Sequence, residues 1–150
     1  MPKEQHPYIA DHFDDNITWK NLIIGTFPPK FGCPNRTDLF RYFYGNKGSI
    51  WEIIRDTGLY PEFDFETVEN IKLWQKEYSV GITDVLVQCS RKSGKECSSA
   101  DVDLTVDYKT DLNASLKVYV LKNIEHIELI YFTSGSESEN GKSAYFLFTK

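Results

Sequence analysis

The sequence predicts a single layered α/β domain, spanning residues 1–150 and built on a central, mainly parallel sheet. Two observations carry this prediction. First, three apolar runs rich in β-branched residues are typical of buried strands, at 21–26, 80–87 and 127–132. Second, helical patterns stand between or after these runs, at 50–58, 65–76, 111–121 and 141–148. Strands that alternate with helices favour a parallel sheet flanked by helices.

Capping residues define where the helices begin and end. Ser49 and Glu52 have the spacing of a capping box, and Gly58 closes the helix that they open. Asp64 is expected to cap the helix that follows. Two polar stretches are expected to be loops or loosely ordered, 2–18 and 90–103.

Bulk composition narrows the class of protein. A hydrophobic fraction of 41% with 15% aromatics predicts an ordered core rather than a disordered chain. No apolar run reaches the roughly 18 residues that a membrane helix needs, and the N-terminus lacks the apolar stretch of a signal peptide. We therefore expect a cytoplasmic protein with no membrane partner.

The cysteines are expected to be plain thiols. Cys33, Cys89 and Cys97 are an odd number and form no Cys-x-x-Cys pair. The three histidines stand in no ligand-like spacing, so no metal is expected. Glycine-rich nucleotide loops are also absent from the sequence, so we expect no cofactor.

The loop after the first strand is the predicted site. Gly25 ends the buried run, and Pro28 and Pro29 can join neither a strand ladder nor a helix interior. Ligands of open α/β sheets bind at the carboxyl ends of the strands. The loop 25–32 is therefore well placed to contact a ligand.

Three blocks in order along the chain carry a resemblance. They are Ile24-Gly-Thr-Phe-Pro-Pro29, then Tyr42-Phe-Tyr-Gly-Asn-Lys-Gly-Ser-Ile-Trp51, then Gly81-Ile-Thr-Asp-Val-Leu86 continued by Cys89, Arg91 and Ser99-Ala-Asp101. Their order and spacing resemble the uracil-DNA glycosylase superfamily, and most closely its hypoxanthine-DNA glycosylase-like branch. The resemblance implies a three-layer α/β/α fold. It also implies a metal-independent enzyme that flips a damaged or deaminated base of the uracil or hypoxanthine class out of DNA and hydrolyses its N-glycosidic bond.

The resemblance also assigns site residues. The base pocket would be formed by Gly25, Thr26, Phe27, Pro28, Phe43 and Tyr44, although core packing is an equal alternative for the three aromatic rings. The attacking water would be oriented by Asn46, Ser49, Asp84 or Asp101. Plainer roles compete with these: a left-handed loop residue for Asn46, a cap or turn acid for Asp84 and a solvated loop acid for Asp101.

DNA phosphates would be met by basic residues close to the same loops, namely Lys30, Lys47, Arg91 and Lys92. A solvated loop face is the alternative for this cluster. The formal net charge of −5 disfavours nucleic acid, but a local basic patch can outweigh an acidic remainder.

Two departures from the family leave a second function open. Phe27 stands where well-known members have the Asp or Asn that positions water, and the family's late DNA-inserting block does not follow Lys150. The alternative is a catalytically inactive domain that binds nucleic acid or a protein partner; a weaker one is an enzyme of free nucleosides. A sheet that lacks its last strand would also expose an edge to which a second copy could pair.

Overall fold

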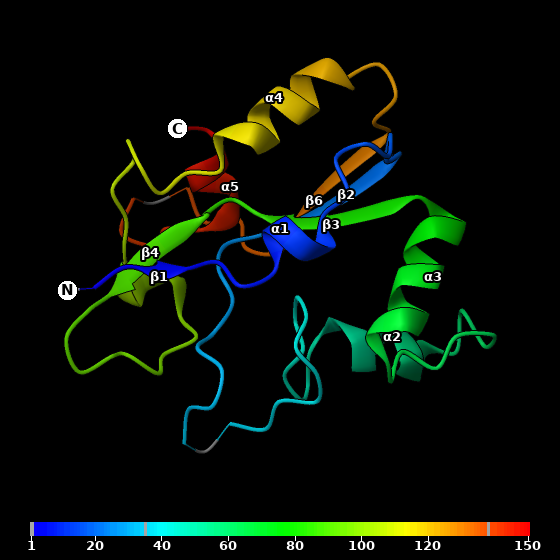
Figure 1. The fold of residues 1–150 in the computed structure, drawn as a ribbon, viewed down its shortest axis with the longest axis horizontal. Helices are drawn as coiled ribbons and strands as arrows, with labels where there is room; N and C mark the ends of the chain where they lie inside the picture. The colour runs from blue at the N-terminus through cyan, green and yellow to red at the C-terminus, as the bar shows by residue number, and fades with distance from the viewer. Residues whose placement is uncertain (1, 35, 138) are drawn as a thin grey trace.

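A parallel three-stranded sheet forms the centre of the computed structural model, which describes residues 2–34, 36–137 and 139–150. β2 (Asn21–Gly25) lies between β3 (Val80–Asp84) and β6 (Leu129–Phe132) (Figure 1). Both pairings are parallel and in register, with Gly25 opposite Asp84 and Ile24 opposite Phe132. The carboxyl ends of all three strands therefore meet at one edge of the sheet.

Two hydrophobic clusters cover opposite faces of this sheet, because side chains alternate along each strand. Leu22 and Ile24 belong to a cluster that also holds residues of α4 and α5, whereas Ile23 packs against a cluster formed with α2 and α3. The helices are α1 (Ile9–His12), α2 (Ile50–Thr57), α3 (Val68–Tyr78), α4 (Ala114–Lys122) and α5 (Ala144–Phe148). The prediction of a mixed α/β domain with a parallel sheet is confirmed.

Helix α2 ends as predicted, but α3 begins later than predicted. Gly58 closes α2 in the left-handed conformation at φ 68°. Asp64 does not cap α3: its carboxylate accepts the amide hydrogen of Glu66 at 2.9 Å and so forms a turn. The cap is Thr67, whose hydroxyl accepts the amide hydrogen of Asn70 at 3.2 Å.

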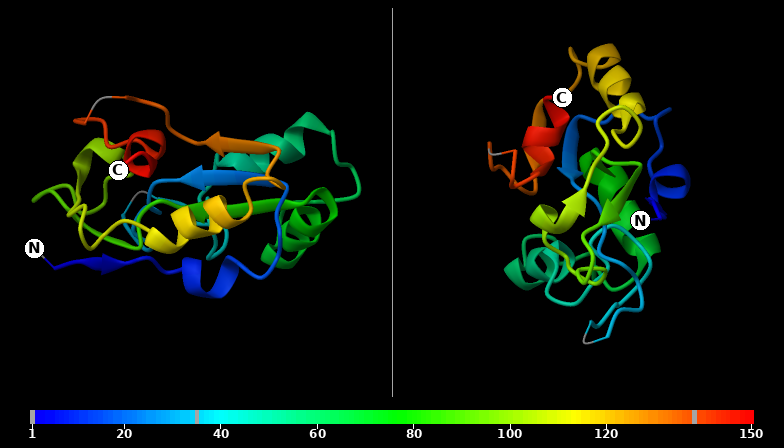
Figure 2. Two further views of the ribbon diagram at one scale, coloured as in Figure 1. Left: turned by 90° about the horizontal axis from the view of Figure 1, so that it is seen from above. Right: turned by 90° about the vertical axis from the view of Figure 1, so that its left-hand side faces the viewer.

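A second, antiparallel sheet was not predicted: β1 (Glu4–Gln5) lies within the expected loop 2–18, β4 (Gln88–Arg91) overlaps the start of the expected loop 90–103, and β5 (Leu104–Thr105) directly follows that loop. The strand order of this sheet is β1–β4–β5. Figure 2 shows the N-terminal strand beside β4, at the end of the molecule away from α2 and α3. Strands of two to four residues are too short to show the alternation by which strands are recognised.

None of the helices in the described part of the chain is long and apolar enough to cross a bilayer. Strand β6 pairs with β2 alone among the described residues, so its outer edge carries unpaired backbone groups.

Candidate functional site

Polar side chains gather where the three parallel strands end. Asp101, from the short 3-10 helix Asp101–Asp103, accepts a hydrogen bond from the Thr26 hydroxyl at 2.9 Å and from the Ser134 hydroxyl at 2.8 Å. Thr26 follows β2 and Ser134 follows β6, so this carboxyl group joins the ends of two strands. Burial raises the pKa of Asp101, the two hydroxyl hydrogen bonds oppose that rise, and the charge of Asp84 adds to it.

Asp84 lies at the end of β3 and is buried, with its side chain 5% exposed. One of its oxygens, Oδ2, lies 2.7 Å from Nε2 of His6. Its backbone carbonyl accepts a hydrogen bond from the Asn113 side chain at 3.0 Å. Asp84 therefore caps no helix. Its carboxylate is buried among the polar side chains at the carboxyl ends of the three strands, which we call the strand-end cluster: His6, Thr26, Tyr44, Asp84, Asp101 and Ser134.

Tyr44 completes the cluster from the second block. A side chain at Gly25 would overlap the Tyr44 hydroxyl and Oδ1 of Asp84, so these two groups converge on the bare backbone of Gly25. Burial raises the pKa of Tyr44 well above its ordinary value, and the charge of Asp84 raises it further. The Tyr44 hydroxyl consequently stays protonated at neutral pH and can donate a hydrogen bond.

The predicted loop lines a groove of about 250 Å³ together with the N-terminal segment. Its aromatic walls are Tyr8, Phe27 and Phe31, and its cations are Lys30 and Arg41. The Arg41 guanidinium lies 4.1 Å from the centre of the Phe31 ring. The volume lies just below the range of drug-sized sites.

Not every predicted pocket residue reaches this groove. Phe27 and Pro28 line it, whereas Phe43 is 1% exposed and packs in the cluster around Trp51. Core packing, the alternative for Phe43, is what the structure shows. The reason is local: the Trp51 indole donates to the Phe43 carbonyl at 2.7 Å and fixes that residue inside.

Asn46 and Ser49 are not joined to the carboxyl groups by any contact within the described residues. Asn46 and Lys47 line a separate groove of about 480 Å³. The residues of this segment with a positive φ are Tyr44, at 55°, and Gly48, at 76°, and not Asn46. Ser49 is buried at the start of α2, and its hydroxyl makes no hydrogen bond within the described part of the chain.

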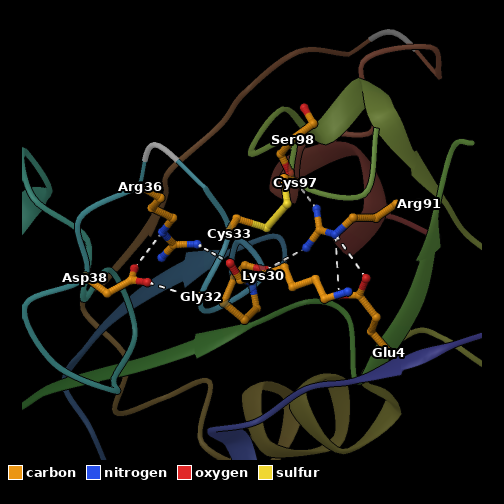
Figure 3. Close-up of a disulfide and its surroundings, with 10 residues drawn as sticks. Glu4, Lys30, Gly32, Cys33, Arg36, Asp38, Arg91, Cys97 and Ser98 are labelled. Atoms are coloured by element: carbon orange, nitrogen blue, oxygen red, sulfur yellow. Dashed lines mark hydrogen bonds and ion pairs between the residues drawn. A yellow bond between two sulfur atoms is a disulfide. The ribbon is translucent and has the colours of Figure 1, made fainter. Parts of the chain in front are cut away.

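Arg91 does not stand on the surface with Lys92, because it is only 3% exposed. Its guanidinium donates to the carbonyl oxygens of Pro28 at 2.9 Å and Ser98 at 2.7 Å, and pairs with Glu4 at 3.4 Å (Figure 3). The expectation of a phosphate contact at Arg91 is therefore wrong. Its position at the end of β4 turns the side chain inward, where carbonyl groups surround it.

The expectation of three plain thiols is also wrong. Cys33 and Cys97 form a disulfide, with Cα atoms 5.6 Å apart (Figure 3). The two residues are 64 positions apart, and no local spacing in the sequence predicts such a pair. Cys89 is a buried free thiol as expected, and burial raises its pKa to about 12. The described residues contain no cluster suited to hold a metal ion.

Sequence reasoning missed two members of the cluster, His6 and Ser134. Ser134 follows the third predicted strand by two residues, so the rule that ligand sites lie at carboxyl ends pointed to it. His6 lies in a stretch expected to be loosely ordered, 78 positions from Asp84, and had no such signal.

In comparisons with known proteins, no protein-family model, no curated protein and no solved structure matches the chain. The three sequence blocks and the geometry of the strand-end cluster are therefore the observations that bear on function.

Proposed function

We propose that this chain is a three-layer α/β/α domain of the uracil-DNA glycosylase type, which removes a damaged or deaminated base from DNA. The observation that carries the proposal is that all three sequence blocks meet at one edge of the sheet. Gly25 comes from the first block, Tyr44 from the second, and Asp84 and Asp101 from the third. Chemistry-bearing residues distant in sequence share this edge, where α/β proteins bind their ligands.

The cluster provides the groups that N-glycosidic hydrolysis requires. Asp84 would accept a proton from water as the water oxygen bonds to the sugar C1′ atom, and its negative charge would stabilise the positive charge that develops on the sugar. The bond from C1′ to the base nitrogen breaks, and its electron pair leaves with the base. The protonated Tyr44 hydroxyl would donate a hydrogen bond to that departing base. The proton held by Asp84 is then returned to the base.

The groove beside the cluster would hold the substrate. Stacking of a base on an aromatic ring is worth about 1–3 kcal/mol, and Phe27 offers a half-buried ring. Lys30 and Arg41 at the same groove, Lys47 at the separate groove of about 480 Å³ and the exposed Lys92 would meet phosphates. Binding should weaken steeply with salt, because each neutralised phosphate releases counterions.

One observation favours a second function, a domain that binds nucleic acid or a protein partner without chemistry. Both carboxyl groups already have partners within the chain: His6 holds Asp84, and Thr26 and Ser134 hold Asp101. A scaffold whose acids serve only to join strand ends would retain its groove and bind without catalysis.

Base release from oligonucleotides that contain uracil or hypoxanthine separates the two functions. We expect release by the wild-type chain and a loss of about 100-fold or more in Asp84→Asn, the range of general-base catalysis. The exposed Asp56→Asn is the matched control and should match wild type. A folded chain that binds the oligonucleotide but releases no base supports the non-catalytic function. A folded chain that binds no oligonucleotide at low salt overturns the glycosylase and nucleic-acid functions, and a protein partner is then the remaining proposal.

A further inference from the structure

The N-terminal segment brings a histidine to the carboxyl edge of the parallel sheet. His6 follows β1, and its amide donates to the Val87 carbonyl at 2.8 Å. The two residues before it pair with β4, Glu4 with Cys89 and Gln5 with Gln88. The backbone is therefore fixed up to the point where the imidazole enters the cluster, and the side chain of His6 is only 1% exposed.

The hydrogen bonds of His6 define which ring nitrogen carries the proton. Nδ1 lies 3.1 Å from the amide nitrogen of Tyr8 and 3.2 Å from that of Ile9. Backbone amides can only donate, so Nδ1 must be the acceptor. The ring proton then stands on Nε2, which donates to Oδ2 of Asp84 at 2.7 Å. His6 therefore donates its Nε2 hydrogen to one oxygen of Asp84, Oδ2.

Aromatic rings hold the imidazole in this orientation. The ring centres of Phe27, Phe43 and Tyr8 lie 5.3, 5.4 and 5.9 Å from that of His6. A flip of the imidazole inside this cage would break the two amide contacts and the contact to Asp84 together. Phe27, the groove residue, is therefore also one wall of the histidine cage.

The second oxygen of Asp84 points elsewhere. While His6 holds Oδ2, Oδ1 lies beside the backbone of Gly25 and converges there with the Tyr44 hydroxyl. The histidine therefore contacts one oxygen of the carboxylate, and the other oxygen lies at the point where the first and second sequence blocks meet.

We propose that His6 is a positioning residue of the site: through Oδ2 it orients the Asp84 carboxylate so that Oδ1 faces the reacting water and sugar. This rests on the proposed glycosylase function. A residue of this kind acts on the rate of the chemical step and leaves the groove, and hence substrate binding, unchanged. At metal centres, loss of a residue that orients a ligand typically costs about 10–100-fold in affinity or activity, and we expect a loss of the same order for His6.

The test compares variants of the full chain in base release. His6→Phe keeps an aromatic ring in the cage and removes both nitrogens, so we expect kcat to fall about 10–100-fold with KM unchanged. His6→Gln returns an N–H near the position of Nε2 and should recover most of the rate. His12→Phe is the matched control, because that ring packs on Tyr42, 4.9 Å between centres, and has no contact with Asp84. Wild-type kcat in a folded His6→Phe variant would overturn the proposal.

A measurement without substrate separates this proposal from the proposed function. Nitrogen-15 NMR of the imidazoles should show a slowly exchanging Nε2–H proton in the wild type. That signal should disappear in His6→Phe and shift in Asp84→Asn. A proton found on Nδ1 of His6 contradicts the positioning geometry, whatever the activity. The expected signal without any base release would leave His6 as a structural partner of Asp84, and both the function and the positioning role would fall.

Discussion

The two ends of the molecule are stabilised by different interactions. Around the parallel sheet, Leu22, Ile24 and Trp51 are at most 1% exposed, and the stabilisation is apolar burial on both faces. Around the antiparallel sheet, strands are two to four residues long, and specific links hold the loops: the Arg91 contacts and the disulfide. The candidate site lies between these regions: Asp84 comes from the end of β3, Asp101 comes from the 3-10 helix Asp101–Asp103, and the groove is formed by the linked loops.

Substitutions in the apolar end, around the parallel sheet, should cause the largest losses in the free energy of unfolding. Ile24→Ala removes a fully buried side chain of β2, the strand that lies between β3 and β6. It should lower the free energy of unfolding by about 2–5 kcal/mol. Chemical denaturation followed by circular dichroism measures it. Leu121→Ala, at a side chain 73% exposed, is the control and should stay within about 0.5 kcal/mol of wild type. Equal losses in both variants would contradict the apolar account of this end.

Removing the disulfide should have the next largest effect. A link across 64 positions restricts the unfolded chain, so Cys33→Ser with Cys97→Ser should cost about 2–4 kcal/mol of unfolding free energy. A dithiol reductant should have the same effect on the wild type and none on the double variant, since Cys89 is buried and unpaired. A wild type indifferent to the reductant would show that the disulfide contributes nothing to stability.

Arg91 tests the polar links of the same end. Arg91→Met leaves the Pro28 and Ser98 carbonyls without their donor, and should cost about 1–3 kcal/mol of unfolding free energy. The neighbouring exposed Lys92→Met should be nearly neutral. If Lys92→Met proved the more harmful, the assignment of Arg91 as the buried link would be incorrect.

The smallest effect concerns pH. Burial raises the pKa of Asp101 above its value in the unfolded chain. At pH values between the unfolded and the folded pKa, the folded state therefore holds a proton that the unfolded state has already lost. Stability contributed by this group therefore falls as pH rises through the raised pKa. Relative to Asp101→Asn, the wild type should gain stability as the pH is lowered from the folded pKa of Asp101 to its unfolded pKa. Denaturant midpoints at matched pH values give the difference, and an opposite slope would contradict the raised pKa.

The two ends also differ in how far the sequence predicts them. Apolar runs rich in β-branched residues located β2, β3 and β6, because burial of a strand leaves such a run within a few residues. The rule that ligand sites lie at carboxyl ends then led to Gly25 and Asp84. Neither the link from Cys33 to Cys97 nor the approach of His6 to Asp84 leaves a local pattern, since each depends on how distant segments fold back.

Single-turnover base release tests the central claim most directly, with the wild-type chain and Asp84→Asn measured on the same oligonucleotide containing uracil or hypoxanthine. If the cluster at the carboxyl edge is catalytic, free base accumulates with the wild type and at least about 100-fold more slowly with the variant. Equal release by both proteins, or none from a folded wild type that binds the oligonucleotide, would contradict catalysis at this edge.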